Sequence, residues 1–193
     1  STTGGKLTGG VGDNFGTAEF TPIDEDEPDA TNTGNPVSSF LDAAAATDVE
    51  LGTNTQLGAI GGGNAGGAGG TSTFAAGIAV TSVDNSNGEW QFSTDGTAFT
   101  DFDPVVSAGF SKLLDGGNPN HRIRFVPNDN FNTSASSPVE IKYRAWDGSD
   151  GSAAGDVVST AVNGGSSAFS LGQVTKGITV RAVNDQPQSN LGS

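Results

Sequence analysis

The sequence predicts an all-β protein: an antiparallel β-sandwich with long loop insertions rich in Gly, Asp and Asn. Short segments such as residues 139–145 alternate apolar and polar residues, a period typical of half-buried strands. Turns rich in Gly, Asn or Asp end these segments, as in antiparallel sandwiches. No long helix is predicted anywhere. The number of expected strands fits one domain over residues 1–193.

The first quarter of the chain offers few strands. Residues 1–16 are rich in Gly and Thr and are expected to be a flexible lead-in. Residues 17–23 (TAEFTPI) predict a first strand, which Pro22 confines to a sheet edge. Residues 35–41 (NPVSSFL) also read as a strand, whereas residues 42–50 (DAAAATDVE) contain the one plausible helical turn.

Residues 51–76 form a Gly-rich insertion. Its central part, residues 57–70, holds eight glycines in fourteen residues, too many for a strand unless it packs against something. The segment lacks the Lys-Ser/Thr ending of a phosphate-binding loop and no helix is expected after it, so a nucleotide site is not predicted. We expect a long surface insertion, the kind of segment in which binding functions are often found.

From residue 77 onward the pattern becomes regular, with short strands separated by turns. We expect residues 186–193 to be a linker that follows the last strand. The predicted strands are residues 78–83, 89–93, 98–102, 105–114, 121–127, 139–145, a weaker one at 156–162, and 177–183.

The charge and composition narrow the classes of partner. The chain carries 22 acidic against 8 basic residues, a net charge of -14, which disfavours nucleic acid and favours cations. Large apolar residues are sparse, so divalent cations bound to the folded state would add stability that a lean core lacks. There is no cysteine for a disulfide or thiolate-metal site. There is also no methionine, so we expect a piece of a longer protein.

Neither membrane insertion nor catalysis is expected. No apolar run approaches the roughly 20 residues that span a bilayer. The single histidine, His121, precedes a strand and is expected to be a surface residue with a structural or incidental role. No GxSxG motif is present, and no pair of acids stands out as a glycosidase pair.

Calcium suits the acidic residues better than other metals do. Ca²⁺ takes six to eight oxygen ligands from flexible loops, and acids recur here at strand ends. Asp147 and Asp150 follow the strand at 139–145 in a Gly-rich turn, and residues 24–29 hold five acids in six residues. The alternative for such a run is a solvated loop. Because the EF-hand spacing is not matched, a calcium site would be assembled from separate loops.

Several ordered blocks resemble a known family. These are GIAVTSVD, GEWQFSTDGTAFT, HRIRFVPNDNFN, IKYRAWDGSDG and ITVRAVNDQP within residues 77–187, preceded by IDEDEPDATNTGNPVSSFL at residues 23–41. Together they resemble the cadherin-like (Ig-like) domains of very large bacterial repeats-in-toxin (RTX) adhesins. The resemblance implies a Greek-key sandwich, several bound Ca²⁺ ions and a location outside the cell, at the bacterial surface.

The resemblance also implies calcium ligands at two poles of the domain. At one pole an early Glu meets the Asn-Asp that ends the last strand, and at the other an acid-x-acid pair meets the acid after the penultimate long strand. Carried onto this chain, the first pole would join Glu25 and Asp26 to Asn184 and Asp185, and the second would join Asp48 and Glu50 to Asp147, with Asp150 as a secondary candidate.

Three functions are compatible with this resemblance. The family also includes calcium-dependent domains that bind peptides by their free C-terminus, and this chain, which is longer than a simple extender repeat, most resembles these. The resemblance therefore implies a monomeric domain that binds the C-terminus of a peptide or protein on a host or neighbouring cell. The first alternative is a calcium-rigidified spacer whose only partners are neighbouring adhesin domains. The second is calcium-dependent carbohydrate binding, which would require exposed aromatic residues, whereas Trp90 and Trp146 are expected in the core.

Overall fold

The protein is seen here as a computed structural model, which confirms the predicted all-β sandwich. Within the part of the chain that it describes, the only helix is the 3₁₀ turn η1 (Val37–Phe40). The described residues are 19–41, 77–102, 106, 109–133, 138–164 and 167–184, together with the backbone of 65–66 and 70–71.

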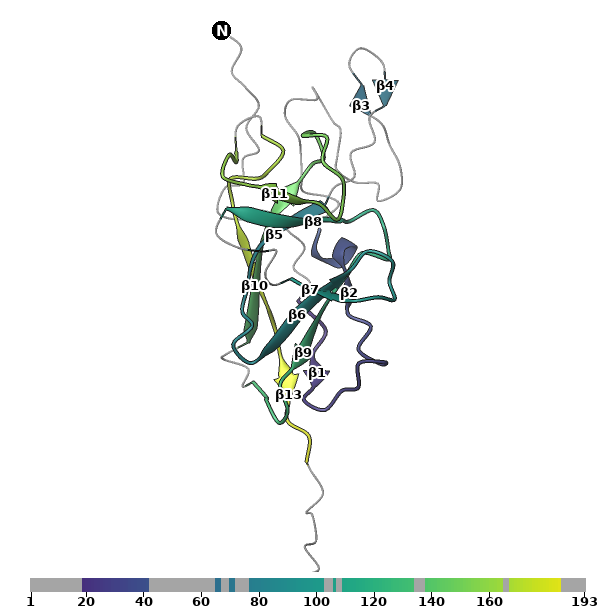
Figure 1. Cartoon of the computed structure of the whole chain (residues 1–193), viewed down its shortest axis with the longest axis vertical. Helices are drawn as coiled ribbons and strands as arrows, with labels where there is room; N and C mark the ends of the chain where they lie inside the picture. Colours follow the sequence, from purple (N-terminus) through teal and green to yellow (C-terminus); the bar gives the residue numbers. More distant parts are fainter. Residues whose placement is uncertain are drawn as a thin grey trace, which may run out of the picture.

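Two antiparallel sheets build the sandwich (Figure 1). The five-stranded sheet, in the order β11-β8-β5-β10-β12, contains β5 (Gly77–Val83), β8 (Phe110–Asp115), β10 (Val139–Trp146), β11 (Val157–Ser159) and β12 (Val174–Ile178). The four-stranded sheet, in the order β2-β9-β6-β7, contains β2 (Asn35–Pro36), β6 (Gly88–Ser93), β7 (Thr100–Asp101) and β9 (Arg122–Pro127).

Two smaller pairs of strands complete the topology. β1 (Ile23–Asp24) and β13 (Val180–Arg181) run parallel to each other at the end of the sandwich where the described chain leaves it (Figure 1). β3 (Ala65–Gly66) and β4 (Gly70–Thr71) pair antiparallel within the Gly-rich insertion.

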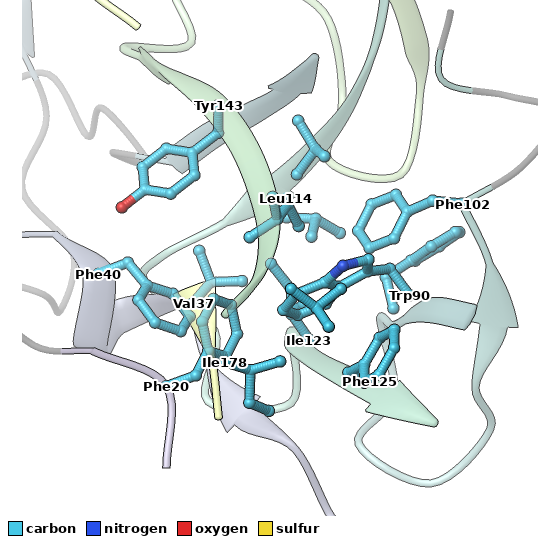
Figure 2. Close-up of a cluster of buried hydrophobic side chains, with 14 of the residues drawn as sticks. Phe20, Val37, Phe40, Trp90, Phe102, Leu114, Ile123, Phe125, Tyr143 and Ile178 are labelled. Carbon is cyan, nitrogen blue, oxygen red and sulfur yellow. The ribbon is translucent and has the colours of Figure 1, made fainter. Parts of the chain in front are cut away.

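The main core lies between the two sheets, with Trp90 in its centre (Figure 2). The Trp90 side chain is 0% exposed and its ring centroid lies 4.9 Å from that of Phe20 and 5.3 Å from that of Phe125. Tilted aromatic pairs of this kind add stability beyond the burial of apolar area. The expectation that Trp90 belongs to the core is confirmed.

A second, smaller core covers the outer face of the five-stranded sheet. Because side chains alternate along a strand, Ile78 points into the main core while its neighbour Ala79 points to this outer face. The segment after β10 returns over that face, and Phe169 forms an isolated β-bridge with Trp146. The cluster consists of Ala79, Leu113, Trp146, Ala168 and Phe169. Trp146 is therefore a core residue, as predicted. Ala168 and Phe169, which follow it in the chain, cover this part of the outer face of the sheet.

The strand predicted at residues 35–41 is largely wrong. Only Asn35–Pro36 forms a strand, and Val37–Phe40 forms the 3₁₀ turn instead. Val37 and Phe40 are three residues apart, so this turn places both side chains on one face, where both are 0% exposed. The Ser39 hydroxyl donates to the Pro36 carbonyl at 2.7 Å, a local bond that competes with sheet pairing.

Other predicted strands differ in length. The first strand is reduced to Ile23–Asp24, with Phe20 buried outside any strand. The strand expected at residues 177–183 is two strands, because the chain changes partner at Thr179: β12 pairs with β10, whereas β13 pairs with β1. The helical turn predicted at residues 42–50 lies outside the described residues.

Candidate functional site

Glu25 lies at the end of the sandwich where the described chain leaves it. β1 brings Glu25 beside β13, and the Glu25 backbone N–H donates to the Arg181 carbonyl at 3.0 Å. The Glu25 side chain then turns to the residue that follows: Oε1 accepts the backbone N–H of Val183 at 2.8 Å. One carboxylate of the acidic loop is thus fixed to the departing chain.

The Glu25 carboxylate is buried, with 8% of the residue exposed. Burying a carboxylate is costly unless its oxygens receive hydrogen bonds. Val183 supplies one, and the amide Nδ2 of Asn132 donates to the other oxygen at 2.9 Å. Each carboxylate oxygen has further acceptor capacity, so a cation can still be coordinated.

Asn132 is the residue that the sequence did not single out. It lies between β9 and β10, 107 positions from Glu25. The only sequence feature pointing to it is its place in a polar loop, NDNFN, that follows a strand. That feature marks a turn and carries no information about its distant partner.

The other acids of the loop at residues 24–29 are less buried than Glu25. Asp24, Asp26 and Asp29 are exposed. Arg124 lies 3.5 Å from the Asp29 carboxylate, so part of the repulsion within the run is relieved by a basic residue of β9. The expected role of Asp26 as a cation ligand stays a prediction.

The other predicted members of this pole are Asn184 and Asp185. Asn184 is exposed. It directly follows Val183, whose N–H donates to Glu25, so Asn184 lies at the same end of the domain as Glu25. Asp185 lies outside the described residues. Of the four predicted ligands, Glu25 and Asn184 are placed at one end of the domain, and Asp26 is exposed beside them.

Asp147, from the second predicted pole, follows β10 and begins the outer loop. Its backbone N–H donates to the Ala168 carbonyl at 3.1 Å, and its Oδ1 accepts the Ser149 N–H at 2.8 Å. The acids expected to join it, Asp48 and Glu50, lie outside the described residues. The proposed grouping of the three therefore stays a prediction.

Asp150 connects the outer loop to the second core. Its Oδ1 accepts the indole N–H of Trp146 at 3.0 Å, and its Oδ2 accepts the Ser152 hydroxyl at 2.8 Å. Burial tends to raise the pKa of Asp150, but the hydrogen bonds from Trp146 and Ser152 outweigh it and the pKa is lowered overall. Asp150 satisfies the indole of a buried tryptophan, which is a structural role.

His121 is buried, with 5% exposed, and the prediction that it lies on the surface is wrong. Its Nδ1 accepts the backbone N–H of Asp115 at 3.0 Å, so the ring closes the turn between β8 and β9. Burial lowers the His121 pKa, against a smaller raising effect of the Asp115 charge. The lowered pKa favours the neutral ring, the form in which Nδ1 can accept the Asp115 N–H.

No group of three or more His, Asp or Glu residues able to hold a metal ion occurs within the described ranges. Both predicted poles have members beyond those ranges: Asp185 for the first, Asp48 and Glu50 for the second. The same part of the chain contains no helix long and apolar enough to cross a membrane.

No protein-family model, no curated protein and no solved structure matches this chain.

Proposed function

We propose that this chain is a calcium-dependent ligand-binding module of a bacterial cell-surface adhesin, located outside the cell. The observation that carries the proposal is the buried Glu25 carboxylate, which lies in an acidic loop and holds the departing chain through Val183. The net charge of -14 adds support, since cations bound to the folded state offset repulsion among carboxylates.

The ligand of the proposed module is the C-terminus of a peptide or protein on a host or neighbouring cell. A Ca²⁺ ion with an unfilled coordination position can accept a carboxylate directly, and Gly- and Asn-rich loops can offer backbone N–H groups to the same carboxylate. Neighbouring adhesin domains are the other proposed partners, and the module acts as a monomer.

The second core favours a binding module over a simple spacer. A spacer needs only the two-sheet sandwich, whereas here Trp146 and Phe169 anchor additional chain on the outer face of one sheet. The spacer remains the second candidate. A carboxylate placed where the chain leaves the domain could bind a Ca²⁺ ion that makes the connection to the next adhesin domain rigid. Carbohydrate binding is less favoured, since both tryptophans are buried.

The sharpest test is calorimetric titration of a C-terminal peptide library with and without Ca²⁺. A binder takes up peptides with a free C-terminal carboxylate only when Ca²⁺ is present, and it rejects the same peptides when they are amidated. If no peptide binds in either condition, the ligand-binding proposal fails and the spacer is preferred.

Chelation tests the calcium part of the proposal separately. We expect EDTA to lower the melting temperature of the wild type, and the Glu25→Gln variant to lose much of that response. Glu27→Gln is the matched control, because it removes the same charge from the same loop but lies outside the proposed ligand set. A melting temperature that chelation leaves unchanged would contradict calcium binding altogether.

A further inference from the structure

The side chain of Asn132 contacts the Glu25 carboxylate from the side of the loop between β9 and β10. Its Nδ2 donates to Glu25 Oε2 at 2.9 Å, while the Val183 N–H donates to Oε1 at 2.8 Å. Glu25, Asn132 and Val183 thus join three segments that are far apart in the sequence. Both oxygens of a buried carboxylate are thereby held by neutral donors.

Asn132 is itself held in place by the residue after it. The Thr133 N–H donates to the Val180 carbonyl at 2.8 Å, and the Val180 N–H donates to the Thr133 hydroxyl at 2.9 Å. β13 is therefore bound by β1 on one side and by Thr133 on the other. The backbone next to Asn132 is therefore fixed relative to the departing chain.

The residues before Asn132 add two further anchors. Phe131 is partly buried against the main core, and its N–H donates to the Asn128 carbonyl at 3.0 Å. Between them, Asn130 has φ of 58°, a left-handed conformation that asparagine tolerates better than most residues. Because these bonds already fix the backbone around Asn132, little further backbone entropy is lost when its amide meets Glu25.

We infer that Asn132 is a positioning residue, whose amide sets the Glu25 carboxylate against the Val183 amide and so fixes the path of the departing chain. Without this donor, a buried oxygen of Glu25 would be left unsatisfied, and the carboxylate would turn to solvent and release Val183. The link to calcium rests on the proposed function; the effect on Val183 does not.

Amide hydrogen exchange of Val183, measured by NMR in calcium-free protein, tests the inference directly. In Asn132→Ala we expect the protection factor of this amide to fall at least about tenfold, as for a lost hydrogen bond to a charged group. Asn128→Ala is the matched control in the same turn, and it should leave Val183 unchanged. Equal Val183 protection in the wild type and a folded Asn132→Ala protein would overturn the inference.

Asn132→Asp distinguishes positioning from a general loss of structure. At pH 7 the introduced carboxylate repels Glu25, and Val183 should be poorly protected. As the pH falls toward about 4, the new Asp, whose pKa the neighbouring carboxylate raises, takes up a proton and again donates to Glu25. Protection should then recover, which a merely damaged loop would not do. Protection that stays equally low at both pH values would count against the inference.

Titrating the same variants with Ca²⁺ separates this inference from the proposed function. We expect Asn132→Ala to weaken Ca²⁺ binding by about tenfold or more, as substitutions of residues that orient metal ligands do. If the wild type binds no Ca²⁺, the proposed function fails while the Val183 measurement still decides the inference. If Val183 protection falls but Ca²⁺ affinity does not, the positioning role is supported and Glu25 is not a cation ligand.

Discussion

The guanidinium of Arg124 lies 3.5 Å from the Asp29 carboxylate, although 95 positions separate the two residues. Arg124 is 8% exposed, and its Nη1 donates to the backbone carbonyls of Asp29 and Asn32 at 2.9 and 3.1 Å. Its Nε donates to Gln91 at 2.7 Å, and its guanidinium lies 4.2 Å from the centre of the Phe99 ring. A single buried cation therefore holds the acidic loop on the four-stranded sheet.

We expect Arg124→Ala to lower the free energy of unfolding by about 2–4 kcal/mol, measured by urea denaturation. The reason is that the substitution leaves several partly or fully buried acceptors without a donor. Arg124→Lys keeps the charge but not the planar fork, so it should recover only part of this loss.

Two controls limit the interpretation of the Arg124 variants. Asp29→Asn should cost less than about 1 kcal/mol, because the Asp29 side chain is 68% exposed and exposed ion pairs contribute little. Arg181→Ala removes an exposed arginine and should stay within about 0.5 kcal/mol. An Arg124→Ala protein as stable as Arg181→Ala would contradict the role given to Arg124.

The buried His121 predicts a loss of stability in mild acid. Its folded pKa is lowered, chiefly by burial, so the unfolded chain takes up a proton first as the pH falls below the usual value of about 6.5. The contribution is complete above that pH and is lost as the pH falls toward the lower folded pKa. The slope from this one proton is at most about 1.4 kcal/mol per pH unit.

Urea denaturation of wild type and His121→Asn between pH 7.5 and 5.5 measures this contribution. Asparagine keeps an acceptor for the Asp115 N–H but does not titrate, so the variant should lose less stability than the wild type over the same interval. Parallel pH profiles for the two proteins would show that His121 is not the titrating group.

Phe169→Ala should destabilise the protein by about 3 kcal/mol, as large-to-small changes in a core do. Phe169 is 5% exposed and bridges to Trp146, so its removal leaves a cavity under the outer loop. Val162→Ala, at a side chain that is 76% exposed in the same loop, is the matched control. Urea denaturation and limited proteolysis would show whether the outer loop detaches. If Phe169→Ala behaves as Val162→Ala does, the second core contributes nothing to stability.

Asp95 should stay ionised far into the acid range. The backbone N–H groups of Thr97 and Ala98 donate to its carboxylate at 2.8 Å each, and with the Ser93 hydroxyl they lower its pKa to about 2. Any stability it contributes is complete above pH 3.8 and is lost as the pH falls toward 2. An NMR titration of the carboxyl carbon measures the pKa directly. Ser93→Ala should raise it, and a wild-type value near 3.8 would refute the assignment.

The sequence alone was sufficient for the regular strands. β5, β6, β9 and β10 begin and end within one residue of the predicted limits, because a period of two depends only on the residues of the strand itself. The same argument placed Trp90 and Trp146 in cores, since large aromatic side chains in strands are usually buried.

Irregular segments could not be predicted in the same way. The 3₁₀ turn at Val37–Phe40 and the short β1 depend on which surface the chain meets, and a local pattern does not record this. The surface position expected for His121 was wrong for the same reason, because the turn that buries it is closed by Asp115 from the preceding strand.

By itself, then, the sequence determined the all-β class, most strand positions and the acidic character that points to cations. Only the tertiary structure decided that Glu25 alone among its acidic neighbours is buried, that Asn132 holds it, and that Arg124 lies against Asp29. Those contacts join residues about a hundred positions apart, and at least one residue of each pair lies in a loop. A loop has no repeating pattern, so its partners are fixed by the packing of the two sheets.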